Sequence, residues 1–478
     1  MTLNDELPAW RRYLAYVTVA VMPIATNVEK IFHFKDKRFL SPLDFLIWPL
    51  LVVVVIEFRN SLRQPPAQRN FAWPPLAGLL WAGLALLSCA WIAHFGEGET
   101  FKTWGRGIQG AIVFGVLAVW VFQNLAPTPA EFRKMSLVLG VSVGLCLLLA
   151  VRQYVGPHGL PYDPDNAAQD LQGVSNIRLG GWYEFRGALG ALVAIFAPAA
   201  AAFAVLDRDS AVRKIAFALA ALSLFVTLSA GGFIGAVAGI VAVMGALAAA
   251  RHWRAALAML LFLVIAIGVM LPHLPRNNPQ EIANGVALYV GEPGKKEAGA
   301  RLRRYQAVVD LLSARTDPYN DKSVPYWVRG VGSGQYQHAT NGFYTFPYDQ
   351  PGARTDEEAQ FGLGTHEPYT FGLFETVVVE LGVFGLIAVL LLFAQWLAAA
   401  SGAFTVFMSR GDHDEATLAL AALGAGCGAL VLSIFGNPAA RGSGSVFAFF
   451  FALALCAQTW ASRPANPQSE AKAETPAA

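Results

Sequence analysis

The chain repeatedly contains runs of about 20 apolar residues, which is the length of helix that crosses a hydrocarbon core about 30 Å thick. Only 14% of its residues are charged, against roughly 25% in an ordinary soluble protein. These two features exclude a water-soluble globular fold. They predict an all-α polytopic membrane protein.

Charged residues, prolines and glycines divide the apolar sequence into about twelve expected transmembrane helices. Two stretches are ambiguous. The first is the tight pair of runs around 229–232, and the second is the overlong run near 372–400, which is either a tilted span or a surface helix that leads into one. The expected spans are residues 12–29, 41–58, 74–93, 107–125, 135–155, 182–206, 212–229, 231–250, 254–273, 372–400, 415–435 and 443–462.

Lysines and arginines in short loops predict the orientation, because cytoplasmic loops carry an excess of both. With twelve spans the basic loops fall on one side, and both termini are then cytoplasmic. The bias is moderate, since Lys30, Lys35, Lys37 and Arg38 lie in the first loop of the other side. The basic residues that we expect to be cytoplasmic are Arg11, Arg12, Arg59, Arg63, Arg69, Arg133, Lys134, Arg208, Arg213, Lys214, Arg251, Arg254 and Arg410.

The non-cytoplasmic side then carries two larger loops, near 156–181 and 274–371. We divide the chain into 1–273 with the first nine spans, the loop 274–371, 372–462 with three spans, and a disordered cytoplasmic tail at 463–478. The large loop contains a helix-like stretch, Ala298 to Ala314, followed by glycine-rich and aromatic sequence. We expect the loop to form a small ordered cap with its own helices.

Several kinds of chemistry are excluded by what the sequence contains. A net charge of +2 gives no argument for nucleic acid as a partner, since binding would need a strongly basic surface. Cys89, Cys146, Cys427 and Cys456 all lie in apolar runs, where they are expected to be small buried hydrophobic residues. We find no metal-ligand spacing, no Walker-type loop and no nucleophile elbow, and therefore expect no metal and no cofactor.

Arginines near the two large loops are the first candidates for a binding site. Arg178 and Arg186 lie at the edge of the sixth expected span, and Arg301, Arg303 and Arg304 begin the helix-like stretch of the large loop, next to Tyr305. A guanidinium stays charged and offers paired donors that match phosphate oxygens, so a diphosphate headgroup is the expected ligand. The alternatives are contact with membrane lipid phosphates, a salt bridge such as one to Glu184, or a solvated basic face.

Two histidines are candidates for a general base. His366 lies where the large loop re-enters the membrane, and His338 lies in a polar stretch of the same loop. Neutral imidazole can accept a proton from a sugar hydroxyl near neutral pH. An isolated histidine is more often structural, so this assignment needs further context.

Four segments together resemble the O-antigen ligase and polymerase family of bacterial envelope enzymes, and more closely the O-antigen ligases. The segments lie between about 176 and 386 and keep the family's order and spacing. They are RLGGWYEFRGALG, the VTLSAGG stretch at 226–232, ARLRRYQAVVDLL followed by RGVGSG at 329–334, and HEPYTFGLFETVVVELGVFG.

The resemblance implies a glycosyltransferase of the bacterial inner membrane that acts on the periplasmic side. Its donor would be O-antigen polysaccharide on undecaprenyl diphosphate, its acceptor the lipid A core, and transfer would be inverting and independent of ATP and metal. The family's loop arginine matches Arg301, with Tyr305 where tryptophan is often found, and its histidine matches His366. Arg178 and Arg186 match less strictly.

Two departures from the family pattern affect these assignments. Ala230 stands where relatives often carry arginine, and Glu367 follows His366 where asparagine or serine is common. The first weakens a one-to-one list of diphosphate ligands, which also includes Arg303 and Arg304. The second keeps His338 as a reserve candidate for the base.

The acceptor is the least determined part of the expected function. An O-antigen polymerase or a protein O-oligosaccharyltransferase would use the same donor with a different acceptor. A transporter of lipid-linked glycan would instead place charge in the middle of its spans, whereas here the arginines gather at the edges. A structural membrane scaffold leaves the arginine-rich loop unexplained.

Overall fold

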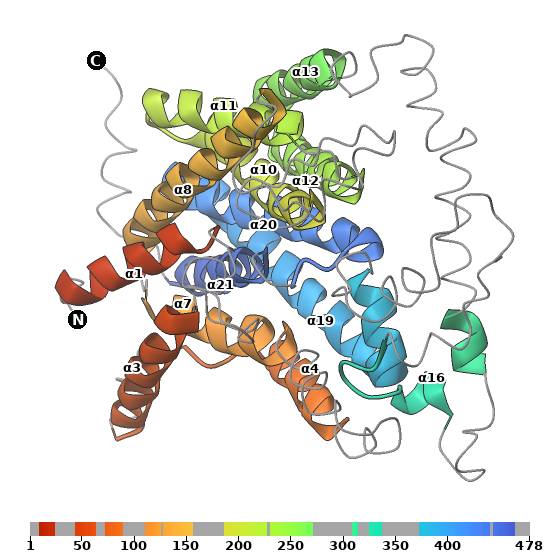
Figure 1. Cartoon of the computed structure of the whole chain (residues 1–478). Coiled ribbons are helices and arrows are strands. Elements are labelled where there is room, and N and C mark those ends of the chain that lie inside the picture. Colours follow the sequence, from red (N-terminus) through yellow and green to blue (C-terminus); the bar gives the residue numbers. More distant parts are fainter. Residues whose placement is uncertain are drawn as a thin grey trace, which may run out of the picture.

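The structure is a computed structural model that describes residues 9–23, 44–63, 72–88, 110–125, 128–155, 186–226, 230–270, 308–313, 325–336, 372–439 and 443–463. Every regular element in these ranges is a helix, as Figure 1 shows. The helices are α1 (Ala9–Val21), α3 (Asp44–Leu62), α4 (Leu76–Leu87), the π-helix η2 (Gly110–Leu117), α7 (Ala118–Leu125), α8 (Pro129–Val155), α10 (Arg186–Leu206), α11 (Ser210–Val226), α12 (Ala230–Ala249), α13 (Trp253–Met270), α16 (Tyr326–Arg329), α19 (Leu373–Arg410), α20 (His413–Phe435) and α21 (Ser443–Ala461).

The helical fold class predicted from the sequence is confirmed in the described part of the chain. Each of the expected spans overlaps one of these helices, or the pair η2 and α7. Six of the helices are long and apolar enough to cross a membrane, which supports a polytopic membrane protein. Those six are Pro129–Val151, Leu189–Leu206, Gly231–Ala249, Leu373–Arg410, His413–Phe435 and Ser443–Ala461.

The two ambiguous stretches have different outcomes. Around 229–232 the chain forms two separate helices, since α11 ends at Val226 and α12 begins at Ala230. The overlong run is α19, whose helical geometry is interrupted at Gly382, with φ of 69°. A short helical segment therefore precedes a longer one across a kink.

Helices α10, α12 and α20 pack closely through small residues at the centre of the bundle. Added Cβ atoms at Gly232, Gly235 and Gly239 of α12 would collide with Gly190, Ala194 and Pro198 of α10, in that order. Because the residue numbers of the contacting pairs rise together on both helices, α10 and α12 run parallel. On α20, Gly428 lies against Ala194 and Gly424 lies against Pro198. The residue numbers therefore run in opposite directions on α20 and α10, so α20 is antiparallel to both α10 and α12.

These small residues also explain why proline is tolerated inside α10. Proline cannot donate the backbone hydrogen bond of a helix, and its ring needs space. The ring of Pro198 occupies the room left by Gly239 and Gly424. Small residues at helix interfaces let backbones approach, which is how helices associate where lipid weakens the hydrophobic effect.

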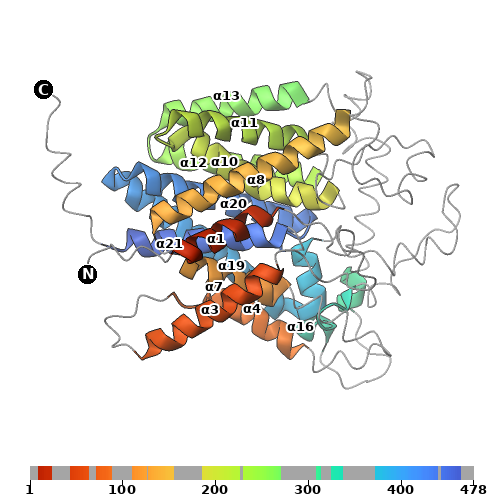
Figure 2. The ribbon, with the colours of Figure 1, turned by 60° about the vertical axis from the view of Figure 1, so that its left-hand side comes forward.

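The remaining helices surround this centre. Helices α11 and α13 lie on one side of it and α3 and α4 on the other, as Figures 1 and 2 both show. Between them, α21 is buried along almost its whole length. Its Phe447 and Phe451 pack against the ring of Trp396 of α19, at centroid distances of 5.1 and 5.4 Å.

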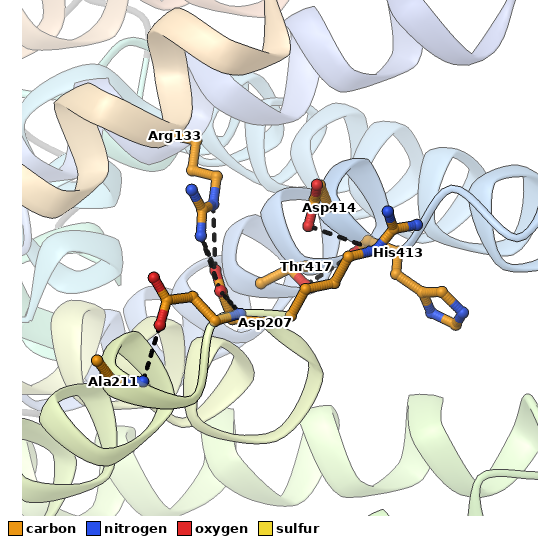
Figure 3. A network of polar contacts seen from close by, with 8 residues as sticks. Arg133, Asp207, Ala211, His413, Asp414 and Thr417 are labelled. Atoms are coloured by element: carbon orange, nitrogen blue, oxygen red, sulfur yellow. Dashed lines mark hydrogen bonds and ion pairs between the residues drawn. The ribbon is translucent and has the colours of Figure 1, made fainter.

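Charged residues link the helices at one end of the bundle, where the sequence predicts the cytoplasmic loops. Arg133 of α8 makes a bidentate ion pair with Asp207, just after α10, with an Nη2–Oδ1 distance of 2.8 Å (Figure 3). The Nε atom of Arg208 lies 3.9 Å from the Oδ1 atom of Asp414, in the first turn of α20. Arg11 of α1 contacts Glu57 of α3 at 2.6 Å. These contacts gather residues that lie in or next to the predicted cytoplasmic loops at one end of the helices.

Candidate functional site

The N-termini of α10, α12 and α19 lie around the last turn of α20, at the opposite end of the bundle. Gly232 in the first turn of α12 packs directly against the backbone of Gly190 in the second turn of α10. Gly231 lies against Phe435, and Leu373, the first residue of α19, donates its N–H to the carbonyl oxygen of Gly436 at 3.1 Å. Helix α20 has 23 residues, so this end is about 34 Å from the Arg208–Asp414 contact.

A turn of the large loop, residues 325–336, docks where α19 is interrupted. The N–H of Val331 donates to the carbonyl oxygen of Val379 at 2.9 Å, and the N–H of Gly332 donates to that of Glu380 at 2.8 Å. In an uninterrupted helix those carbonyl oxygens would accept hydrogen bonds from the N–H groups of residues four positions later in the chain. The turn therefore satisfies carbonyl groups at the helix break. Figures 1 and 2 show α16, the start of this turn, beside the first part of α19.

Two glycines make this approach sterically feasible. Gly330 has φ of 70°, and a Cβ there would collide with the carbonyl of Glu380. Gly382 has φ of 69°, and a Cβ there would collide with the carbonyl of Val328. L-residues with side chains rarely adopt positive φ. Each glycine thus supplies both the backbone conformation and the space for the other segment.

Buried polar side chains reinforce the docked turn. The carboxylate of Glu380, which is only 8% exposed, accepts hydrogen bonds from the backbone N–H groups of Gly334 and Tyr336. The Tyr336 hydroxyl donates a hydrogen bond to the side-chain carboxyl of Glu375, five residues before Glu380 in α19. The oxygens of a carboxyl group can accept hydrogen bonds from N–H and O–H donors. Both acidic residues of this segment therefore bind the turn.

A pair of buried serines attaches the turn to a second helix. Ser88, directly after α4, and Ser333 have hydroxyl oxygens 3.0 Å apart. The N–H of Ser333 also donates to the Ser88 hydroxyl at 3.0 Å. The turn thus bridges α4 and α19.

Apolar side chains connect the turn to a helical piece of the large loop, residues 308–313. Val308 and Leu311 are buried in one cluster with Tyr326, Val331, Tyr336 and Val379. The spacing of Tyr305, Val308, Leu311 and Leu312 predicts an apolar stripe along this helix, and the burial of Val308 and Leu311 agrees with it. The end of the expected Ala298–Ala314 helix therefore lies on the same surface as the docked turn.

No family model matches the chain, and no curated protein matches it in sequence. The site has to be interpreted from its own geometry.

Parts of all four segments that carry the family resemblance meet at this end. Gly190 of the first contacts Gly232 of the second, and RGVGSG of the third docks on ETVVVELG of the fourth. The N-termini of α10, α12 and α19 lie together here, and the dipole of a helix gives its N-terminus a partial positive charge. Such an arrangement favours the binding of an anion at this end of the bundle.

Most of the predicted site residues lie outside the described ranges, and the structure does not test them. Arg186 is the first residue of α10, at the edge of the candidate span that begins at Leu189. Within the described ranges, no group of three or more His, Cys, Asp or Glu side chains could hold a metal ion. The predicted residues outside those ranges are Arg178, Arg301, Arg303, Arg304, Tyr305, His338, His366 and Glu367.

Sequence reasoning missed the polar residues that attach the turn. Glu375 and Glu380 lie inside an expected apolar span, and Ser88 and Ser333 are 245 residues apart in the chain. One available signal was the pairing of a carboxylate with glycine in Glu380-Leu381-Gly382, inside a run too long for one straight span. A buried acidic residue in a membrane helix needs a partner, and the glycine two residues later permits a break in the helix.

Proposed function

We propose that this chain is a glycosyltransferase of the O-antigen ligase type with twelve transmembrane helices. It would move O-antigen polysaccharide from undecaprenyl diphosphate to the lipid A core on the periplasmic side of the bacterial inner membrane. One observation carries the proposal. The described parts of the four family-like segments meet at one end of the bundle, and the predicted cytoplasmic charges lie at the other.

The chemistry needs no activated nucleotide, because the diphosphate carrier is already a good leaving group. Preorganised arginines stabilise negative charge as it develops on that group. Arg178, Arg186, Arg301, Arg303 and Arg304 are the proposed diphosphate ligands, with Tyr305 and Glu367 beside the site. The gathered N-termini of α10, α12 and α19 support an anion at the same end.

Proton transfer is assigned to His366, with His338 in reserve. The imidazole would remove the proton of the acceptor hydroxyl while the arginines hold the diphosphate. Direct attack by that hydroxyl on the anomeric carbon then breaks the bond to the diphosphate and inverts the centre. The departing diphosphate keeps the electron pair.

The assay combines purified protein, lipid-linked O-antigen and lipid A core in detergent, without ATP or divalent metal. A lipopolysaccharide product of higher mass supports the ligase. Elongated lipid-linked glycan selects a polymerase, and glycan on an added Ser- or Thr-bearing acceptor protein selects a protein O-oligosaccharyltransferase. Absence of every product contradicts a transferase and favours transport of the lipid-linked glycan.

Variants assign the roles. His366→Ala should abolish transfer while carrier binding remains, and His252→Ala at the other end of the bundle is the matched control. Arg301→Ala should weaken use of the donor, and Arg301→Lys should restore it only in part, because an ammonium lacks the planar paired donors. Full activity of His366→Ala removes His366 from the mechanism and leaves His338 to be tested.

A further inference from the structure

Glu380 binds the docked turn through both its side chain and its backbone. Its carboxylate accepts from the N–H groups of Gly334 and Tyr336. Its carbonyl oxygen accepts from the N–H of Gly332 at 2.8 Å. One residue of α19 therefore holds three donors of a five-residue stretch.

These donors need partners because the stretch from Gly330 to Gln335 has no regular secondary structure and is mostly buried. Gly332, Ser333, Gln335 and Tyr336 are all buried, and buried N–H groups that lack an acceptor are costly. The break at Gly382 supplies one acceptor by releasing the Glu380 carbonyl, and the side chain supplies the others. The location of the carboxylate directly before the break thus matches what the turn requires.

We infer that Glu380 is a positioning residue, whose buried carboxyl group fixes the 330–336 turn of the large loop to α19 and so holds Ser333 against Ser88 at the end of α4. The attachment itself is a property of the fold. Its consequence for catalysis rests on the proposed function, because the loop that the turn anchors carries Arg301, His338 and His366 in the sequence. Loss of the carboxylate would release the turn and misplace the loop relative to the helix ends.

A disulfide between positions 88 and 333 reports directly on the docked turn. The two serine hydroxyls are 3.0 Å apart, so the double variant Ser88→Cys/Ser333→Cys brings two thiols together only when the turn is docked. Cys89, Cys146, Cys427 and Cys456 are first replaced by alanine. The rate of cross-linking under a mild oxidant is then measured from the loss of thiols that react with maleimide-polyethylene glycol in denatured samples.

With Glu380 in place, we expect fast and nearly complete cross-linking. Glu380→Ala should slow it by about tenfold, as expected for loss of the side-chain hydrogen bonds to the turn. Glu380→Gln keeps an acceptor oxygen and should cross-link at a rate between those of the Glu380 protein and Glu380→Ala. It is used in place of Glu380→Ala if the alanine variant does not fold. Glu57→Ala, which removes a carboxylate at the other end of the bundle, is the control and should leave the rate unchanged.

Glycan transfer by the same proteins separates positioning from chemistry. Glu380→Ala should lose transfer activity, and oxidation of the engineered cysteine pair should restore it because the disulfide replaces the hydrogen bonds. Cross-linking of Glu380→Ala at the unmodified rate overturns the inference. Slow cross-linking without restored activity also overturns it as an explanation of the activity loss. Slow cross-linking in the variant, with no transfer by any protein, rejects the proposed function and leaves the positioning role intact.

Discussion

The N–H of Gly332 donates to the carbonyl oxygen of Glu380 at 2.8 Å, so a loop residue takes the place of the next helical turn. The interruption of α19 and the docking of the loop are thus one structural event. A helix that continued through Gly382 would use the same carbonyl itself.

Gly330→Ala should lower the free energy of unfolding by about 3 kcal/mol, because it combines an unfavourable φ with a collision against the Glu380 carbonyl. Gly411→Ala is the matched control. Gly411 also has positive φ, at 75°, but no atom lies within 4 Å of an added Cβ. It should cost about 1 kcal/mol. Equal losses in denaturant titrations of the two variants would contradict the docked arrangement.

Gly428→Ala should destabilise the centre of the bundle by about 2 kcal/mol, since the new methyl group would collide with the carbonyl of Ala194. Gly245→Ala provides the comparison within a helix. An added Cβ at Gly245 meets nothing within 4 Å, and alanine is the better helix former, so stability should rise by up to about 1 kcal/mol. Thermal unfolding in one detergent measures both.

Arg133→Ala should destabilise the protein by about 3 kcal/mol, because it leaves the carboxylate of Asp207 buried without its cation. The side chain of Asp207 is 1% exposed. Asp414→Asn tests the neighbouring pair, whose two side chains are 62% and 43% exposed. Its effect should stay below about 1 kcal/mol. If the two variants are equally stable, the Arg133–Asp207 pair is not a buried contact.

Thiol labelling tests the predicted orientation. Trp327→Cys lies in the docked turn and His252→Cys lies in a basic loop, and both are made without the native cysteines. A membrane-impermeant maleimide should label position 327 in intact spheroplasts. It should label position 252 only after the membrane is permeabilised. The reverse pattern would invert the topology and move the proposed site to the cytoplasm.

Periodicity of apolar residues predicts where the helices lie but not how α19 is interrupted. Gly382 and Gly385 look alike in the sequence, yet only Gly382 leaves helical geometry. The difference comes from the carbonyl of Val328 against Gly382, in a segment more than 50 residues earlier. A contact between such distant segments has no local signal.

The sequence predicts which segments form the candidate site, but it does not predict the polar side chains that hold those segments together. The resemblance selects segments that meet at one end of the bundle, and the apolar stripe identifies Val308 and Leu311 as buried. The roles of Ser88 and Glu380 depend on tertiary hydrogen bonds, which residue type alone does not reveal. The catalytic histidine and the diphosphate arginines remain predictions.

The packing of α10, α12 and α20 restricts how the protein can change shape. Ala194 and Pro198 meet glycines on both sides, and backbone atoms have no rotamers with which to make way. Sliding one of these helices past another would bring larger side chains into those contacts. The three should therefore move as a single rigid body, and any widening of the bundle would come from peripheral helices such as α3 and α13.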